Sequence, residues 1–304
     1  MRFLIPILLL LVLVLPARAQ ETGLNLLRVG VDAAAGAMGD ARVASADDAF
    51  AAYWNPAGLA AGTRNMAAVS HRIWVADVRS YAVAGRFRAG EKGGIGLSVL
   101  ATDLGDFEAR TQPGDPDGFF SVSSLAVGAS YGRRLGPLRA GLTGRYLSER
   151  IFDARADGYA LDAGLQIGLL GEKLLLGAAL QNLGSMSALA VEATELPTTV
   201  RAGAALSPLR LLTEDGGEVL LDVRVAAEVS YLTPTEEARV HGGAEATLLD
   251  LVTLRGGFIT NDALRAATFG AGLAVGGVVF DYAFLPFESG FEGPGHLLTL
   301  HYAW

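Results

Sequence analysis

The stretch of this sequence that comes nearest to a catalytic motif is Gly128-Ala-Ser130-Tyr-Gly132, which matches the G-x-S-x-G pattern of serine hydrolases. That pattern works only where the serine stands on a sharp turn from a strand into a helix. Here apolar residues occupy every second position from Leu125 to Tyr131, as along a continuous strand. We therefore interpret the match as coincidental and expect no catalytic residues and no enzymatic activity.

The other side chains that could do chemistry are scattered or lie in one acidic stretch. His296 and His301 are an odd number of residues apart and so face opposite ways on one regular strand, while His71 and His241 are distant in sequence. A metal site or an outer-membrane lipase would need contacts that the sequence does not show, so we expect no metal and no cofactor. Residues 103–118 contain five carboxylates: Asp103, Asp106, Glu108, Asp115 and Asp117.

The spacing of these carboxylates does not match an EF-hand loop, whose glycine and closing glutamate have fixed positions. We interpret residues 103–118 as an ordinary acidic surface loop. The alternatives are Ca²⁺ binding and the bridging of cations bound to lipopolysaccharide.

The composition is unusual for a protein surrounded by water. Of the 304 residues, 51% are apolar and only 18% are charged, with 39 glycines, and the mean hydropathy is +0.36. The absence of cysteine excludes disulfides and thiolate metal sites. The net charge of −8 argues against nucleic acid as a partner, because nucleic-acid binding needs a basic surface.

The amino-terminal residues have the pattern of an export signal. Met1-Arg2 is followed by an apolar run over residues 3–15 and by the small-x-small site Ala17-Arg-Ala19. We interpret residues 1–19 as a cleaved signal peptide of a Gram-negative protein. The alternative, an uncleaved anchor, is disfavoured because the apolar run is shorter than the roughly 20 residues that a spanning helix needs.

From Asn65 onward, short segments alternate between apolar and polar positions, which predicts an all-β protein. Their number is even, as bacterial single-chain barrels require. We predict a 14-stranded antiparallel transmembrane β-barrel over residues 65–304, preceded by a short helical plug over residues 20–64. The predicted strands cover residues 65–72, 79–88, 94–102, 119–132, 138–149, 158–169, 173–182, 198–207, 217–230, 239–248, 251–260, 266–275, 277–285 and 296–304.

The connections between the predicted strands are sorted by length: most joins after even-numbered strands are short, and those after most odd-numbered strands are longer. Outer-membrane barrels show this pattern, with turns in the periplasm and loops outside. A soluble β-sandwich, the alternative fold, gives no reason for it. The join over residues 208–216 is longer than the pattern prefers.

The polar face of the strands is expected to line the lumen. Fourteen strands enclose more space than side chains can fill, so the lumen is wet or plugged and the apolar face meets lipid. An arginine on the lipid side at mid-membrane would cost about 2–4 kcal/mol. The charges predicted to face the lumen are Arg139, Arg145, Asp162, Arg201, Asp222, Arg224, Glu228, Arg239, Glu245, Arg255 and Asp281.

The last strand carries an additional signal. Leu298, Leu300, Tyr302 and Trp304 share one face, and the sequence ends on the aromatic residue. This ending resembles the signal read by the barrel-assembly machinery, with Tyr302 and Trp304 as its recognised residues. Outward aromatic residues near other strand ends fit the girdles at the two membrane interfaces.

The segment before the first strand is alanine-rich and predicts a short helix over Ala49–Tyr53. Asp47 and Asp48 are suited to cap its start, and Asn55, which precedes a proline, ends it. Such a small segment could fold into the lumen and fill it. The alternative is a periplasmic leader that packs against the turns.

This segment carries a family resemblance. Met38-Gly39-Asp-Ala, Ala-Asp47-Asp48-Ala and Tyr-Trp-Asn55-Pro56-Ala57-Gly58-Leu resemble the amino-terminal signature of the PorV/PorQ family. Further matches are Gln-Asn-Leu-Gly at 181–184, Leu-Pro-Thr-Thr-Val-Arg-Ala-Gly at 196–203 and Asp-Tyr-Ala-Phe at 281–284. That family is similar to the FadL-type transporters, which are fourteen-stranded barrels plugged by an amino-terminal hatch with an Asn-Pro-Ala motif.

The resemblance implies two alternative functions. PorV-type members act in type IX secretion, where the barrel receives secreted cargo proteins and passes them to the surface-attachment machinery. FadL-type members move hydrophobic small molecules through a lateral opening. We favour protein binding, although the modest outer loops weaken it, and keep the channel as the alternative. An apolar pocket between plug and wall, with a gap in the strand pairing, would support the channel.

Overall fold

The computed structural model describes residues 23–75, 78–109, 118–189, 195–208, 220–288 and 293–304. The signal-peptide prediction for residues 1–19 lies outside this range. So do Asp115 and Asp117 of the acidic stretch.

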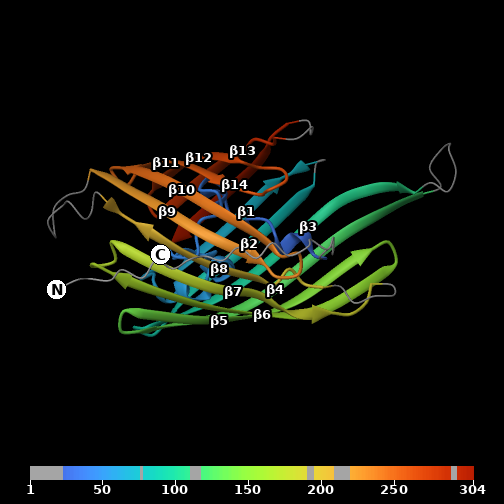
Figure 1. The fold of residues 1–304 in the computed structure, drawn as a ribbon, viewed down its shortest axis with the longest axis horizontal. Helices are drawn as coiled ribbons and strands as arrows, with labels where there is room; N and C mark the ends of the chain where they lie inside the picture. The colour runs from blue at the N-terminus through green and yellow to red at the C-terminus, as the bar shows by residue number, and fades with distance from the viewer. Residues whose placement is uncertain (1–22, 76–77, 110–117, 190–194, 209–219, 289–292) are drawn as a thin grey trace, which may run out of the picture.

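Fourteen antiparallel strands close into one barrel, each paired with its neighbours in sequence and β1 paired with β14 (Figure 1). This confirms the predicted fold, and every predicted strand has an observed counterpart. The strands are β1 (Met66–Ile73), β2 (Arg79–Ala89), β3 (Gly93–Ala109), β4 (Gly118–Leu135), β5 (Leu138–Ile151), β6 (Ala154–Leu169), β7 (Leu174–Met186), β8 (Thr199–Leu206), β9 (Leu221–Leu232), β10 (Glu237–Leu248), β11 (Val252–Ile259), β12 (Ala267–Val275), β13 (Val278–Leu285) and β14 (Gly295–Ala303).

Several strands continue into regions that the sequence predicts to be loops. β3 and β4 have 17 and 18 residues and form a hairpin that reaches beyond the neighbouring strands, so Asp103, Asp106 and Glu108 lie in a strand (Figure 1). The prediction that residues 103–118 form a loop is therefore wrong for much of that range. The predicted loop over 150–157 is reduced to a tight turn, in which Phe152 adopts a left-handed φ of 56°.

Alternate residues of each strand face opposite sides of the wall. In β14, Leu297 and Thr299 are each 1% exposed, whereas Leu300 and Tyr302 are 45% and 52% exposed. The exposed side of the barrel is almost entirely apolar, and its aromatic residues include Trp304, whose ring stacks on Tyr302 at 5.7 Å. Lipid is the solvent that suits this face, since charges on it would be costly.

The two ends of the barrel are told apart by their connections. One end holds the start of β1, the end of β14 and the short turns, so we call it the periplasmic end. The opposite, extracellular end holds the β3–β4 hairpin and most of the longer connections. The β8–β9 connection at the periplasmic end runs from Ser207 to Leu220 and remains longer than the pattern predicts.

Residues 23–64, which we call the plug, lie inside the barrel (Figure 1). They comprise η1 (Asn25–Leu27), α1 (Ala33–Ala37), α2 (Ala51–Trp54) and η2 (Pro56–Ala60). The plug begins at the extracellular end, where the Gly23 amide donates to Glu195, and finishes beside the periplasmic ends of β3 to β6. Among the described residues, no helix is long and apolar enough to cross a membrane.

The helices of the plug differ in detail from the prediction over Ala49–Tyr53. The observed helix begins at Ala51, because the Asp48 carboxylate accepts a hydrogen bond from the Phe50 amide at 2.8 Å and shapes the turn before it. Asn55 does end this helix, but it also caps the 3-10 helix that follows by accepting from the Ala57 amide at 3.1 Å. α1, capped by Asp32, is not predicted from the sequence.

Candidate functional site: the contact between plug and barrel wall

Glycines on the inner wall allow the plug backbone to touch the strands directly. A Cβ at any of these positions would collide with the plug, mostly with its backbone, so the close approach depends on a bare Cα. The wall glycines that face the plug in this way are Gly94, Gly132, Gly141, Gly164, Gly177, Gly243 and Gly257. The plug is thus in van der Waals contact with the wall on several sides.

The Asn55-Pro56 turn is the most firmly held part of the plug. The fully buried Asn55 amide nitrogen donates to the Val43 carbonyl within the plug at 2.8 Å, and to the wall carbonyls of Leu165 and Ala178 at 3.0 and 3.3 Å. One side chain therefore ties two plug segments to β6 and β7. A Cβ on Gly164 would collide with the Asn55 side chain, and one on Gly141 of β5 would collide with the Pro56 backbone.

Two wall glutamines complete the hydrogen bonding of the plug. Gln166 donates to the Ala46 carbonyl at 3.1 Å, and Gln181 donates to the Trp54 carbonyl at 3.1 Å. Buried carbonyls without partners are costly, so these amides stabilise a plug that has little regular structure of its own. The sequence shows both as polar residues on the lumen face of a strand but does not identify their partners.

The Met38-Gly39 part of the signature forms a second anchor. Gly39 has a left-handed φ of 65°, its amide donates to the Thr268 hydroxyl at 3.1 Å, and its carbonyl accepts from His241 at 2.8 Å. Met38 is fully buried against the glycines of β10 and β11. His241 is therefore bonded to the plug, whereas the other three histidines contact wall side chains or plug aromatic residues.

Charged residues of the wall contact the plug at several further points. Glu228 accepts from the Val43 amide at 2.8 Å and pairs with Arg201, whose guanidinium lies over the Trp54 ring at 5.1 Å. Arg145 lies over the Tyr53 ring at 5.4 Å. Arg201 and Arg145 are thus held both by wall carboxylates and by plug aromatic rings.

The remaining predicted lumen charges pair within the wall or with its turns. Arg224, Glu245, Arg255 and Asp281 form a continuous chain across β9 to β13, with distances of 2.8, 3.0 and 2.6 Å. Arg139 pairs with Glu172 of the β6–β7 turn, Arg239 pairs with Asp262 at 3.3 Å, and Asp222 is half-buried. All eleven predicted charges therefore lie on the inner side, but only some of them contact the plug.

A buried ion pair also links the plug to the wall at the extracellular end, and the sequence does not predict it. Arg265, in the β11–β12 connection, reaches Asp40 of the plug and Asp262 beside it, each at 3.0 Å, and lies over the Trp74 ring at 5.4 Å. Burial opposes ionisation of Asp262, but the Arg265 charge outweighs it and lowers the pKa of Asp262 below its usual value. This contact fastens the plug to the extracellular end.

Within the plug, Asp32 and Arg42 join segments that are separate in sequence. Asp32 accepts from the Ala35 amide at 2.8 Å and from the Trp54 indole at 2.7 Å, and so connects α1 to α2. Arg42 pairs with Asp48 at 2.7 Å. Burial opposes ionisation of Asp48, yet the Arg42 charge holds the pKa of Asp48 below its usual value.

The contribution of Asp32 to docking of the plug is expected to weaken as the pH rises through the pKa of this carboxyl. Burial, reinforced by the Asp48 charge, raises the pKa of Asp32 from its ordinary value of 3.8 to about 6. The docked plug therefore binds the proton more tightly than a released one. The Asp32 carboxyl by itself therefore favours docking at low pH, and its contribution, on the order of 3 kcal/mol, is lost as the pH rises from 4 to 6. Protease cleavage of the plug, followed against pH in detergent, measures this loss.

The control for this prediction is the variant Asp32→Asn. Other buried groups at the contact between plug and wall also titrate, so the contribution of Asp32 is the difference in pH dependence between the natural chain and Asp32→Asn. Asp48 stays ionised in the docked plug over this range, because its pKa is lowered. Equal pH dependence in Asp32→Asn and the natural chain would contradict the assignment to Asp32.

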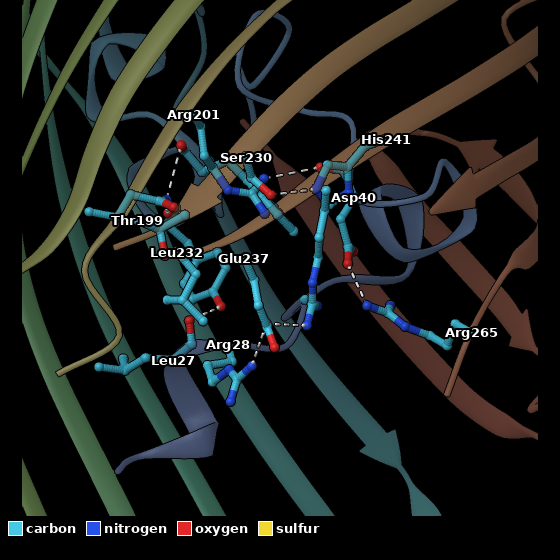
Figure 2. A pocket seen from close by; sticks show the side chains of 15 residues that line it. Leu27, Arg28, Asp40, Thr199, Arg201, Ser230, Leu232, Glu237, His241 and Arg265 are labelled. Carbon is cyan, nitrogen blue, oxygen red and sulfur yellow. Dashed lines mark hydrogen bonds and ion pairs between the residues drawn. The ribbon is translucent and has the colours of Figure 1, made fainter. Parts of the chain in front are cut away.

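Two small cavities lie beside the plug among the residues that the structure describes. A polar cavity of about 50 Å³ lies near the extracellular end, where Arg28, Arg201, Arg239 and Arg265 converge with Glu237 and other polar residues (Figure 2). A second lumen cavity, beside Leu26, has about 10 Å³. These volumes suit a few water molecules. Larger hollows of about 760 and 550 Å³ lie on the outward, lipid-facing side of β4 to β8.

The plug signature is largely gathered at this contact. Met38, Gly39, Asn55, Pro56 and Ala57 touch the wall or are fully buried beside it, and Gly58 packs on the Ala46 backbone. Asp47 is exposed at the surface of the plug. Ser130 of the G-x-S-x-G match lies inside β4, where it accepts a hydrogen bond from Thr143 at 2.8 Å.

The chain is similar to known proteins of both kinds that the sequence suggests, the PorV family and the FadL-type barrels. Residues 16–168 match the model of a family described as Type IX secretion system protein PorV. No curated protein matches the chain. Among solved structures, the chain is similar to the toluene transporter TbuX of Ralstonia pickettii, at 15% identity and a TM-score of 0.65, over 90% of this chain and 98% of that one.

Two further structures show the same likeness. The CymD monoaromatic hydrocarbon channel has 13% identity and a TM-score of 0.61, over 90% of this chain and 97% of that one. A Pseudomonas aeruginosa FadL homologue has 11% identity and a TM-score of 0.55, over 91% and 98%. At these identities the similarity establishes the fold alone, which is that of an outer-membrane barrel.

Proposed function

This chain belongs to the PorV family, whose model matches residues 16–168, just over half of its length, and we propose that it is a protein-binding outer-membrane component of type IX secretion. The family match is the observation that carries this proposal. In this role the barrel offers its surface to exported proteins or to other subunits of the secretion system. It does not provide a pore of its own.

The small volume of the two lumen cavities among the described residues supports this role. Cavities of about 50 and 10 Å³ beside the plug do not form a route for a protein or for a hydrocarbon. The extracellular end, by contrast, offers the projecting β3–β4 hairpin as a contact surface. The extracellular surface available for binding is therefore larger than the modest loops predicted from the sequence would provide.

The alternative is a channel for hydrophobic small molecules, and the fold shared with the toluene transporter and the monoaromatic hydrocarbon channel supports it. An apolar cavity of about 150 Å³ is the size that holds benzene. The lumen cavities among the described residues are smaller, and the larger one is lined mainly by polar side chains. We therefore rank the channel second.

The test is co-purification from native membranes. The full chain, tagged in an exposed loop, is expected to retain other secretion subunits and exported proteins after mild cross-linking, while an equally abundant tagged barrel from the same membranes does not. Deletion of the gene should leave exported proteins in the periplasm. Normal export, combined with lost uptake of radiolabelled toluene, would instead establish the channel.

We further propose that residues 1–19 are removed as a signal peptide, so that the mature chain starts at Gln20 or Glu21. We also propose that Tyr302 and Trp304 are read by the barrel-assembly machinery. The exposed, stacked rings of these two residues at the end of β14 support this role.

A further inference from the structure

One sector of the periplasmic end is strongly basic. The side chains of four residues there are exposed and that of a fifth is half-buried. One of the five lies just before β1, and the others lie in or beside the β2–β3 and β4–β5 turns. We call this sector the basic rim: Arg64, Arg88, Lys92, Arg133 and Arg134.

Backbone contacts place these five residues side by side. The Arg88 amide donates to the Asn65 side chain at 3.0 Å, which brings the chain around Arg64 next to the end of β2. In the next hairpins, Arg133 is paired in register with Gly93, and the Arg134 amide donates to the Lys92 carbonyl at 2.7 Å. The basic rim is therefore one continuous surface and not a scatter of charges.

The basic rim stands out against the rest of the molecule. The whole chain has a net charge of −8, yet the turns and strand ends of this sector contain five cations and one side-chain carboxylate, Glu91. The terminal carboxylate of Trp304 lies beside Asn65, and the exposed Asp47 lies near Arg64, since Arg86 donates to the backbone carbonyls of both. Within the described part of the chain, no carboxylate forms an ion pair with any of the five cations. The other described turns at this end contribute Glu172, Lys173 and Asp250. Positive charge thus exceeds negative charge on this side of the rim.

The height of the basic rim matches the membrane interface. Outward-facing aromatic rings lie immediately above it on the same strands, at Phe87 and Tyr131, with Trp304 beside Phe87 at 6.3 Å. Such rings mark the level of the lipid headgroups in outer-membrane barrels. Arg133 shares the outward face of β4 with Tyr131, whereas Arg88 and Arg134 alternate with outward residues and leave their strands on the lumen side. Long basic side chains at the strand ends can reach around the rim and extend their charged ends toward phosphate.

We propose that the basic rim binds the phosphate groups of anionic phospholipids in the periplasmic leaflet of the membrane. Cations that lie next to an aromatic girdle and below a lipid-facing wall meet headgroups first, so lipid fits this surface better than an acidic periplasmic protein. Each basic residue near an anionic lipid surface adds to the attraction, and salt screens it. The proposal is independent of the secretion role.

The test measures lipid selectivity at Trp304, which is exposed at the same interface. The full chain is reconstituted in vesicles that contain brominated phosphatidylglycerol or brominated phosphatidylcholine, and quenching of tryptophan fluorescence gives the relative affinity for the two lipids. Trp54 is 2% exposed inside the barrel and is shielded from the bromine, and the half-buried Trp74 at the extracellular end is replaced in every sample by the substitution Trp74→Phe. We expect phosphatidylglycerol to be preferred about tenfold at low salt, with the preference lost at high salt.

The variant Arg88→Gln, Lys92→Gln, Arg133→Gln should lose this preference. The matched control changes three exposed arginines at the extracellular end, Arg79→Gln, Arg150→Gln and Arg155→Gln, and should keep it. Equal loss in the control, or no preference in the natural chain, would overturn the proposal. If the triple variant fails to assemble, judged by its migration in unheated gels, the salt dependence of the natural chain decides: a salt-independent ratio overturns the proposal.

Discussion

A barrel that lacks residues 23–61 will conduct ions, whereas the intact chain will give no resolvable channel steps. Fourteen strands enclose more volume than inward side chains fill, and the plug occupies that volume here. Its removal leaves an inner wall rich in Arg, Asp and Glu, which water and ions enter readily. Conductance in planar bilayers and the swelling of liposomes in a neutral sugar both measure the open lumen.

A second variant keeps the plug but weakens its attachment to the wall, so it tests whether the attachment itself closes the lumen. Replacing Asn55 and Pro56 together by alanine removes the three hydrogen bonds that the Asn55 amide donates, two of them to wall carbonyls. This variant should show brief openings, while its barrel assembles normally and migrates as a folded barrel in unheated gels. A correctly folded deletion barrel that stays silent would show that the plug does not close the lumen.

The strands could be predicted from the sequence because the bilayer imposes a strict rule on them. Residues that face lipid must be apolar and those that face the lumen tolerate charge, so a period of two persists along β5, β6 and β9. Where the wall projects beyond the membrane this rule no longer applies. Beyond Thr102, β3 has carboxylates at both alternating sets of positions, at Asp103 and at Asp106, so the sequence predicts a loop there.

The contacts of the plug could not be predicted for a different reason. Its partners are far apart in sequence, as Gln166 is from Ala46, and each contact depends on which plug carbonyl faces which strand. The glycines of the wall indicate that some backbone approaches the strands closely. The sequence does not show, however, that Gly164 is needed to make room for Asn55. α1 was missed because an alanine-rich stretch with an internal glycine gives no amphipathic pattern.

Replacement of Asp162 by alanine is expected to destabilise the folded barrel by about 3–5 kcal/mol. Asp162 is 2% exposed and pairs with Arg145 at 2.7 Å, and it also accepts from the Asn182 amide at 2.7 Å. That amide lies at a register shift between β6 and β7, where Asn182 adopts a φ of 59°. The carboxylate therefore stabilises both a buried guanidinium and an irregular strand pairing.

The size of this effect comes from the charge that would be left behind. Without Asp162, Arg145 keeps a hydrogen bond to the Asn182 side chain at 3.1 Å and its contact with the Tyr53 ring of the plug, but it has no counter-ion. Replacing both members of the pair by leucine removes the uncompensated charge and should cost less than the single change. The exposed pair of Arg155 and Asp157 is the matched control, and Asp157→Ala should leave the unfolding midpoint unchanged.

Denaturant unfolding in detergent micelles measures all of these variants in one series. If Asp162→Ala unfolds at the same denaturant concentration as Asp157→Ala, the buried pair does not stabilise this part of the wall. If the double leucine variant is as unstable as the single one, the loss comes from the Asn182 amide and not from the unpaired charge of Arg145. Because Arg145 also lies over Tyr53, protease access to the plug in the same variants shows whether the wall and the plug are stabilised by one network or by two.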